Sequence, residues 1–350
     1  MINQVELRPG YAISRVIRGN WQLAGGHGAI GEAAALDALE AAFDAGLTTF
    51  DCADIYTGVE ALIGAFRARL SARRGAEAAR ALKVHTKLVP DLDCLPAISK
   101  SYVEGIVDES LRRLGVERLD LVQFYWWDYA VPGAVDALVW LDEIRAAGKI
   151  QLLGGTNFDT AHTAAILDAG VPLASMQTQS SLLDQRPANG LAELCAARGV
   201  ALLCYGTVAG GFLGDHWLGR PEPTGALENR SLTKYKLVVD DFGGWALFQE
   251  LLRVCRTIAD RHGVDIATVA SRYALDRPGV AAVIVGGRSP DHALANADID
   301  ALRLTAQDRA HLDAVLSRRQ GPTGDAYTLE RDRGGRHGAV MKYNLNAAPH

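Results

Sequence analysis

Short runs of apolar residues alternate with longer amphipathic stretches along almost the whole chain. Most of the runs are continuous rather than alternating, which is typical of strands in a parallel sheet whose outer face is covered by helices. The runs predict eight strands, at residues 15–19, 47–51, 83–87, 119–124, 150–156, 173–178, 200–205 and 281–286.

The amphipathic stretches between these runs predict helices, for example at residues 32–46, 101–115 and 134–148. Each of them ends in glycine, which supplies a left-handed helix cap, and the next apolar run follows within a few residues. Successive strands begin roughly 25 to 35 residues apart, the size of one βα unit. Eight such units in a row predict an α/β fold of the (β/α)8 TIM barrel type rather than an open, doubly wound sheet.

One connection departs from this spacing, because about 75 residues separate the seventh run from the eighth. Its first half, residues 206–236, is rich in Gly, Pro and polar residues and predicts a long loop on the barrel rim. Helices are predicted after it, at 245–263 and 265–279. We therefore expect a single barrel catalytic domain over residues 1–320. Residues 321–350 are charged and Gly-rich, and are expected to be a C-terminal extension over or beside the rim, or a partly disordered tail.

Composition narrows the class of protein. The 350 residues include 36 Lys and Arg against 41 Asp and Glu, a net charge of −5, which argues against a nucleic-acid or anionic-membrane partner. No apolar stretch approaches the ~18 residues of a membrane helix, and the N-terminal sequence lacks the basic-then-apolar order of a secretory signal. We expect a soluble, cytoplasmic protein that acts on a small molecule, and the sequence leaves its oligomeric state open.

Cysteine and histidine spacing predicts no metal site. The five cysteines show no C-x-x-C pair and no metal-ligand spacing, so they are expected to be reduced core thiols. No carboxylate–histidine cluster appears either. The cysteines are Cys52, Cys94, Cys195, Cys204 and Cys255.

Candidate chemistry lies where the predicted strands end, because a barrel of this type carries its active site at that face. The second strand ends at Asp51, Tyr56 follows five residues later, and the third strand ends at Lys87. A phenol ordinarily titrates near ~10, and a neighbouring ammonium favours the phenolate and so brings its pKa toward working pH. With Asp51 orienting Lys87, Tyr56 is a candidate proton donor to a substrate oxygen. A rim salt bridge beside an unrelated tyrosine is the plainer alternative.

An ordered set of motifs resembles the aldo-keto reductase superfamily. FDCADIY, EALIGAF and HTK are similar to the family's Asp-x4-Tyr after strand two and its Lys at the end of strand three. LLGGTNF, MQTQSSLLDQRP, CYGTVAGGFL and IVGGRSPDHALAN resemble the ends of its strands five to eight. Each motif is weak by itself, but the set runs in order from Gly19 to Ala310.

The resemblance implies roles for individual residues. Asp51, Tyr56 and Lys87 match three catalytic residues, with Tyr56 the general acid. Trp21 is similar to an aromatic residue that lines the substrate pocket. From the sequence itself, Trp126 puts further aromatic bulk on the rim after strand four, which suggests an apolar wall for the substrate.

The resemblance also implies NADP(H) as cofactor. Contacts are expected to the nicotinamide carboxamide, to the face of the nicotinamide ring, to the pyrophosphate through backbone N–H groups, and to the adenosine end. An arginine at the adenosine end favours a 2′-phosphate, and so NADPH over NADH. In chain order, the residues are Thr156, Asn157 and Gln177 for the carboxamide, Tyr205 for the ring, Gly206, Gly210, Gly211 and Leu213 for the pyrophosphate, and Gly286, Arg288, Ser289, His292 and Asn296 for the adenosine end.

One position departs from the family pattern. The fourth catalytic residue is normally a histidine at the end of strand four, where the run DLVQFYWWDY has Tyr125. A tyrosine side chain also donates one hydrogen bond, but the side chain is longer than that of histidine and the pKa of its phenol is higher. Either Tyr56 or Tyr125 is then a candidate proton donor, although Lys87 favours Tyr56. His85 lies one layer deeper in the third strand and is no obvious substitute.

Several functions stay open at this point. The interpretation we favour is an NADP-dependent oxidoreductase that reduces an aldehyde or ketone to an alcohol, with Tyr125 as a further catalytic residue. The altered position also fits a reductase of an imine or conjugated C=C bond, an introduced disabling substitution, or a cofactor-binding protein with little turnover. A metal- or Schiff-base-dependent barrel enzyme using Lys87 is the remaining alternative.

Overall fold

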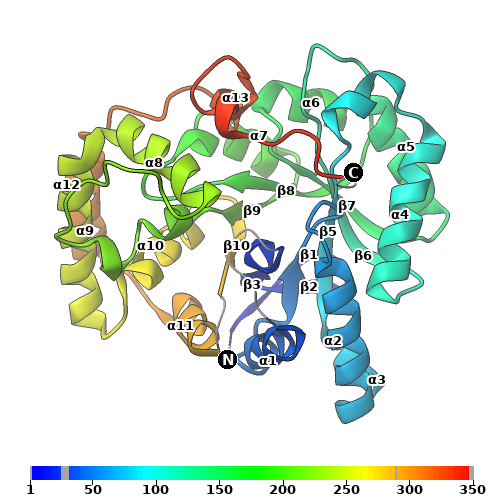
Figure 1. The fold of residues 1–350 in the computed structure, drawn as a ribbon, viewed down its shortest axis with the longest axis horizontal. Coiled ribbons are helices and arrows are strands. Elements are labelled where there is room, and N and C mark those ends of the chain that lie inside the picture. The colour runs from blue at the N-terminus through cyan, green and yellow to red at the C-terminus, as the bar shows by residue number, and fades with distance from the viewer. Residues whose placement is uncertain (1, 25–30, 288–289, 347–350) are drawn as a thin grey trace.

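Eight parallel strands close into a barrel surrounded by helices (Figure 1). The computed structural model describes residues 2–24, 31–287 and 290–346. The strand order around the barrel is β10-β3-β4-β5-β6-β7-β8-β9, so the predicted (β/α)8 TIM barrel is confirmed. The barrel strands are β3 (Val16–Gly19), β4 (Thr49–Asp51), β5 (Lys83–Leu88), β6 (Leu119–Phe124), β7 (Ile150–Thr156), β8 (Leu173–Gln179), β9 (Ala201–Tyr205) and β10 (Val280–Val285).

The helices follow the capping signals in the sequence. The Ser99 side chain accepts a hydrogen bond from the backbone N–H of Tyr102 at 3.2 Å and begins α4, and Gly115 ends that helix with a φ of 64°. The described helices are α1 (Glu32–Asp44), α2 (Val59–Arg74), α3 (Ala76–Ala81), α4 (Lys100–Leu114), α5 (Ala134–Ala146), α6 (Thr160–Asp168), α7 (Leu191–Ala197), α8 (Arg230–Phe242), α9 (Gly244–His262), α10 (Ile266–Leu275), α11 (Pro290–Ala301), α12 (Ala306–Leu316) and α13 (Thr328–Arg331).

An N-terminal hairpin closes the end of the barrel at which the strands begin. Strands β1 (Gln4–Arg8) and β2 (Tyr11–Ser14) pair antiparallel and pack on inward-facing barrel residues. The Tyr11 hydroxyl lies 3.2 Å from Nε2 of His85, and burial lowers the pKa of His85 to about 3. This hairpin is not among the predicted elements, because its strands are only five and four residues long. The Pro-Gly pair between them was the available signal.

The connection from β9 to β10 differs from the sequence prediction. Residues 230–236, expected to belong to the rim loop, instead form the first part of α8. The Asn229 side chain caps this helix by accepting from the backbone N–H of Leu232 at 3.0 Å. Tyr235, Val238 and Phe242 lie at helical spacing and are buried. The polar residues between these apolar positions concealed the helix from the sequence analysis.

The C-terminal residues 321–346 cross the mouth of the barrel, by which we mean the end where the barrel strands terminate. In Figure 1 this segment runs from α12 at the left, over the strands, toward α4 and α5 at the right. His337 Nε2 lies 2.7 Å from Asp241 Oδ2 on α8. Near the other side of the mouth, the Asn346 side chain donates to the carbonyl oxygen of Val89 at 2.9 Å. The segment therefore spans the entrance of the barrel.

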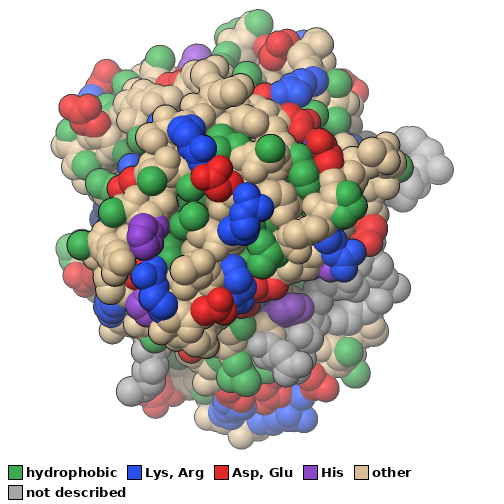
Figure 2. All heavy atoms as spheres, turned by 90° about the vertical axis from the view of Figure 1, so that its left-hand side faces the viewer, with side chains coloured by type: hydrophobic (Ala, Val, Ile, Leu, Met, Phe, Trp, Pro, Cys, Tyr) green, Lys and Arg blue, Asp and Glu red, His purple; other side chains and the backbone are tan. Residues whose placement is uncertain are grey.

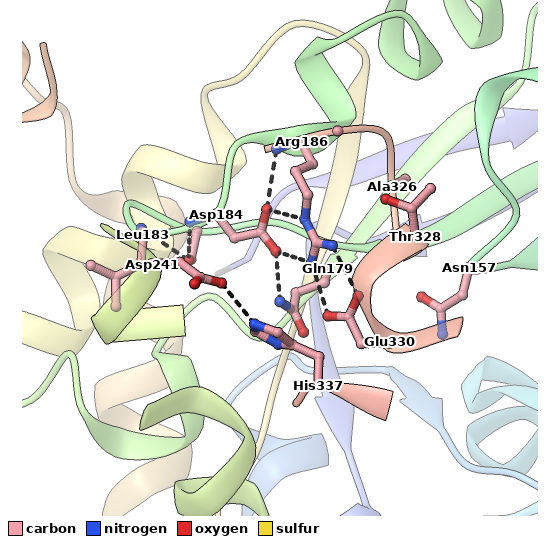
Figure 3. Close-up of polar contacts among 12 residues, drawn as sticks. Asn157, Gln179, Leu183, Asp184, Arg186, Asp241, Ala326, Thr328, Glu330 and His337 are labelled. Atoms are coloured by element: carbon pink, nitrogen blue, oxygen red, sulfur yellow. Dashed lines mark hydrogen bonds and ion pairs between the residues drawn. The ribbon is translucent and has the colours of Figure 1, made fainter. Parts of the chain in front are cut away.

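A buried ion cluster anchors this segment (Figure 3). Arg186 donates two hydrogen bonds to the Glu330 carboxylate, at 2.8 and 2.9 Å, and one to Asp184 Oδ2 at 2.7 Å. All three side chains are at most 1% exposed. Asp184 also accepts from the Gln179 amide at 2.6 Å. Burial by itself would raise the pKa of Glu330, but its hydrogen bonds and ion pair with Arg186 hold that pKa at about 2.

The outer surface over α9 and α12 carries both basic and acidic side chains, with hydrophobic side chains between them (Figure 2). Within the described residues, no helix is long and apolar enough to traverse a bilayer.

Glu330→Gln should destabilise the protein and loosen the C-terminal segment. It removes one partner of a buried ion pair, so we expect a loss of about 3 kcal/mol of unfolding free energy in urea at pH 7. Because the folded pKa of about 2 lies below the ordinary value of 4.5, the stabilisation is present above about pH 4.5 and is lost as pH falls toward 2. The deficit of the variant should therefore shrink over that range. Glu117→Gln, at an exposed position, is the control, and equal stability of the two variants would contradict the anchoring role.

Candidate active site

A buried ion pair joins the ends of β4 and β5. Lys87 Nζ donates to Asp51 Oδ2 at 2.7 Å and to the carbonyl oxygen of Cys52 at 2.8 Å. The Asp51 and Lys87 side chains are 6% and 7% exposed. Burial opposes the charge on Lys87, but Asp51 outweighs it and holds the pKa of the ammonium above its usual range. Lys87 is therefore a fixed positive charge at the barrel mouth.

Two glutamines complete the set of partners around Asp51. Gln177 Nε2 donates to Asp51 Oδ1 at 2.6 Å, and Gln123 Nε2 donates to the same oxygen at 3.3 Å. Gln177 also donates to Gln123 Oε1 at 3.2 Å. Gln123, which pairs with Lys87 in the β5–β6 ladder, is not among the predicted site residues. A polar side chain next to the end of the apolar run 119–124 was the available signal in the sequence. Hydrogen bonds from three side chains fix the Asp51 carboxylate.

Tyr56 lies in the turn after β4, against the same ion pair. Lys87 Nζ is 5.1 Å from the centroid of the Tyr56 ring, and the Trp21 ring centroid is 4.9 Å away. Burial raises the pKa of Tyr56 above 10.0, and the nearby Lys87 only partly opposes this. Lys87 lowers this pKa, as expected, but desolvation of the phenolate, which the expectation left out, is the larger effect. Tyr56 is a protonated donor at neutral pH.

Tyr125 lies at the mouth beneath the C-terminal segment. Its ring makes edge contacts with Trp127 and Tyr327, at centroid distances of 4.7 and 6.0 Å. The Arg331 guanidinium carbon lies 4.9 Å from the Tyr125 centroid. Burial raises the pKa of Tyr125 well above the usual value, with Arg331 opposing it. The contact predicted between Tyr125 and a substrate oxygen stays a prediction.

The aromatic residues after β6 divide between core and rim. Trp126, predicted to line the substrate pocket, is 0% exposed, and its indole N–H donates to the carbonyl oxygens of Asp128 and Val131 at 2.9 and 3.0 Å. It is a core residue beneath the loop, so that assignment is corrected. Trp127 instead contacts Tyr125 and Tyr343 at the mouth. Alternation along an extended chain sends neighbouring side chains to opposite faces, and the sequence alone does not show which face the mouth takes.

The residues expected to hold a nicotinamide come from neighbouring strand ends. The Tyr205 hydroxyl donates to Asn157 Oδ1 at 2.9 Å, and the backbone N–H of Asn157 donates to the carbonyl oxygen of Gln177 at 2.8 Å. Asn157 has a φ of 58°, a left-handed conformation that asparagine tolerates better than most residues. Thr156 is the buried last residue of β7. The structure thus brings these four predicted residues together.

The loop after β9 needs its glycines because α8 packs against it. A Cβ atom at Gly206 would overlap the Tyr235 hydroxyl, and one at Gly210 would lie 2.8 Å from a carbon of the same ring. The φ angles at these glycines are 74° and 66°, and that of Gly211 is 108°. Leu213 is fully buried below the loop. This close approach of backbone fits the predicted cradle for a pyrophosphate.

The expected adenosine end is described only in part. Arg288 and Ser289 lie outside the described residues. Asn296 Nδ2 donates to the carbonyl oxygen of Gly286 at 3.0 Å, and His292 is exposed near the start of α11.

Arg18 of β3 also lies at the expected adenosine end, and it is not among the residues predicted from the sequence. It is 2% exposed, and its Nε has no hydrogen-bond partner among the described residues. Burial lowers its pKa to about 10. Its Nη1 lies 3.2 Å from the place a Cβ of Gly287 would take. Nη1 also donates to the carbonyl oxygen of Gly19 at 3.3 Å, which leaves Nε as the unpartnered nitrogen among the described residues. A buried guanidinium of this kind beside a glycine pair suits a nucleotide phosphate, so the residues present fit a dinucleotide.

Within the described ranges, no three or more His, Cys, Asp or Glu side chains form a group that could hold a metal ion.

Comparison with known proteins gives a consistent result. Residues 15–317 match the family model described as the aldo/keto reductase family. The aldo-keto reductase YhdN of Bacillus subtilis is 24% identical over 313 residues, covering 88% of this chain and 91% of that protein. The NADH-specific methylglyoxal reductase of Escherichia coli is 24% identical over 321 residues, covering 87% and 94%.

A third relative is flagellar radial spoke protein 5 of Chlamydomonas reinhardtii, 30% identical over 264 residues. That match covers 64% of this chain and about half, 49%, of the longer relative. Among solved structures, the glycerol dehydrogenase AKR11B4 from Gluconobacter oxydans superposes with a TM-score of 0.74 at 21% identity, covering 93% of this chain and 97% of that one. This structural likeness concerns the fold.

Asp51→Asn should destabilise the protein by about 3–5 kcal/mol in urea unfolding at pH 7, because it leaves the Lys87 ammonium buried without its counter-charge. Lys87→Met should cost a similar amount for the converse reason. The double variant, which has neither charge, should lose far less than the sum of the two single losses. Additive losses would show that the two side chains do not stabilise each other.

Proposed function

The chain belongs to the aldo/keto reductase family, and on that premise we propose that it is an NADP(H)-dependent oxidoreductase that reduces an aldehyde or ketone to an alcohol. The observation that carries the proposal is the buried Asp51–Lys87 pair with the Tyr56 phenol against it. Members of the family use nicotinamide cofactors. When bound, the cofactor supplies the hydride.

In this proposal Tyr56 gives the proton. Its raised pKa keeps the phenol protonated at neutral pH, so it can donate a hydrogen bond to a carbonyl oxygen and transfer the proton as that oxygen gains negative charge. Lys87 then stabilises the phenolate that remains, and Asp51 keeps the ammonium charged and in place. The resting pKa and the catalytic role are compatible, since Lys87 acts at the moment when the negative charge forms.

We assign Tyr125 to the mouth as a second phenol beside the substrate, in the place where the family normally has histidine. Its hydroxyl can donate one hydrogen bond, and its ring is held by Trp127 and Arg331. A second candidate function, a cofactor-binding protein with little turnover, draws support from this replacement together with the C-terminal segment that crosses the mouth.

For the cofactor we propose NADP(H) rather than NAD(H). Arg18 supports this choice, because its buried guanidinium has an Nε without a partner among the described residues and an Nη1 close to Gly287. Arg288, the residue after Gly287 in the sequence, is a second basic residue. Thr156, Asn157 and Gln177 would hold the carboxamide, and Tyr205 would face the nicotinamide ring.

Tyr56→Phe should slow hydride transfer by about 10²–10⁴-fold, because the proton donor is removed while the binding residues remain. Single-turnover oxidation of NADPH by benzaldehyde measures this directly. In the wild type, the chemical step of reduction should be level from about pH 6 to about pH 9, because the pKa of Tyr56 lies above 10.0. The reverse oxidation needs the phenolate and should speed up as pH rises.

Tyr125→His tests the second phenol in the same assay. Faster reduction would show that the enzyme is a carbonyl reductase with altered activity, whereas slower reduction would indicate a pocket adapted to tyrosine.

For the Tyr56→Phe test, an unchanged single-turnover rate would rule out the role of Tyr56 as the acid.

Cofactor choice is tested by thermal shift with NADPH, NADP+, NADH and NAD+. A ligand that binds only the folded state raises the melting temperature according to its affinity, so the two 2′-phosphorylated forms should give the larger shifts. Equal shifts for NADPH and NADH would refute the preference. Shifts without turnover of any aldehyde would favour the cofactor-binding protein.

A further inference from the structure

Lys234 of α8 is a cation at the barrel mouth that the catalytic scheme does not use. Its Nζ lies 5.5 Å from the ring centroid of Tyr205, 5.2 Å from that of Tyr235 and 5.2 Å from that of Tyr327. Three faces of aromatic rings therefore surround one ammonium, which is half-buried. An aromatic ring attracts a cation through its quadrupole, but it is neutral and so does not compensate the positive charge.

The ammonium has no acidic partner among the described residues, where no carboxylate oxygen lies within 4.0 Å of Lys234 Nζ. The acids whose charges act on it are Glu330 and Asp184, and both are ion-paired with Arg186. Burial lowers the pKa of Lys234, and Glu330 only partly opposes this.

Its neighbour Lys236 shows the contrast, since that ammonium is paired with Glu222 at 2.6 Å and Asp240 at 2.5 Å. An uncompensated, half-buried ammonium is unfavourable by itself and is stabilised by an anion.

The cage around Lys234 adjoins the proposed reaction site. Tyr205 is the residue expected to face the nicotinamide, and its hydroxyl donates to Asn157. Tyr327 comes from the C-terminal segment and makes an edge contact with Tyr125. The ammonium thus lies next to Tyr205, a proposed cofactor residue, and next to Tyr327, which in turn contacts Tyr125.

We propose that Lys234 binds the carboxylate of the substrate, so that this enzyme prefers carbonyl compounds that carry a carboxylate over neutral ones. The inference rests on the proposed function, since it names the substrate class of the same site. The ammonium donates charge-assisted hydrogen bonds to the carboxylate, while cation–π contacts with Tyr205, Tyr235 and Tyr327 hold the ammonium in place. A phosphate of the cofactor is the rival occupant, because α8 also packs against the glycine loop after β9.

The test compares two pairs of aldehydes, 4-carboxybenzaldehyde with benzaldehyde and succinic semialdehyde with butanal. The wild type should have the larger kcat/KM for the carboxylated member of at least one pair. Lys234→Gln should reduce the charged-to-neutral ratio of kcat/KM by about 10-fold to 100-fold, the range for loss of a hydrogen bond between charged groups. Lys234→Arg keeps the charge and should retain part of the preference. Lys236→Gln, on the same helix but paired outside the mouth, should leave both members of each pair unchanged.

Three results would overturn the proposal. A wild type without preference in either pair removes its basis, and an unchanged ratio in Lys234→Gln makes the cage a structural contact only. A main effect of Lys234→Gln on the Kd of NADPH, measured by tryptophan fluorescence, assigns the ammonium to a cofactor phosphate.

Calorimetric titration with 4-(hydroxymethyl)benzoate separates this failure from failure of the proposed function. If no aldehyde turns over, binding of this carboxylate that is lost in Lys234→Gln but kept in Lys236→Gln still supports the anion site. Equal binding by all three proteins refutes it.

Discussion

The Asp51–Lys87 ion pair is the interaction on which the rest of the site depends. Closure of the barrel brings β4 and β5 side by side and buries both charges at the mouth. Charges taken out of water must find partners, and here those partners converge on one carboxylate: the ammonium, Gln177 and Gln123. The result is a positive charge with a fixed position next to the Tyr56 phenol. A loop salt bridge exposed to solvent would provide neither the position nor the field.

The C-terminal segment extends the same principle to the entrance. Glu330 brings a negative charge to a buried arginine that already holds Asp184 (Figure 3). Three residues before Glu330, Tyr327 lies between Lys234 and Tyr125 and contacts both. Arg331 donates to the carbonyl oxygens of Trp127 and Asn157, each at 2.9 Å. Tyr327, the N-cap residue of α13, and Arg331, its last residue, thus lie against aromatic rings of the mouth.

Local patterns predicted much of this arrangement, and long-range contacts account for the remainder. Continuous apolar runs located all eight barrel strands to within two residues at either end, because burial on both faces leaves a plain signature. Strand ends likewise pointed to Asp51, Tyr56 and Lys87. What failed depends on surroundings that no local pattern encodes: the side on which Trp126 is buried, and the desolvation that raises the pKa of Tyr56. Glu330 drew no attention because Arg186 lies far away in the sequence, and Lys234 drew none because Tyr205 and Tyr327 do.

The pairing of β3 with β10 has a kinetic consequence. Val16 and Val283 are direct neighbours in the ladder, although they lie 267 residues apart in the sequence. A contact between residues so far apart in the sequence costs the conformational entropy of the long chain between them. This cost comes before the contact contributes any stability. We therefore expect closure of the barrel to be a late event in folding. Until then β3 has an open edge in the nascent molecule, and it is in this interval that association with other chains competes with folding.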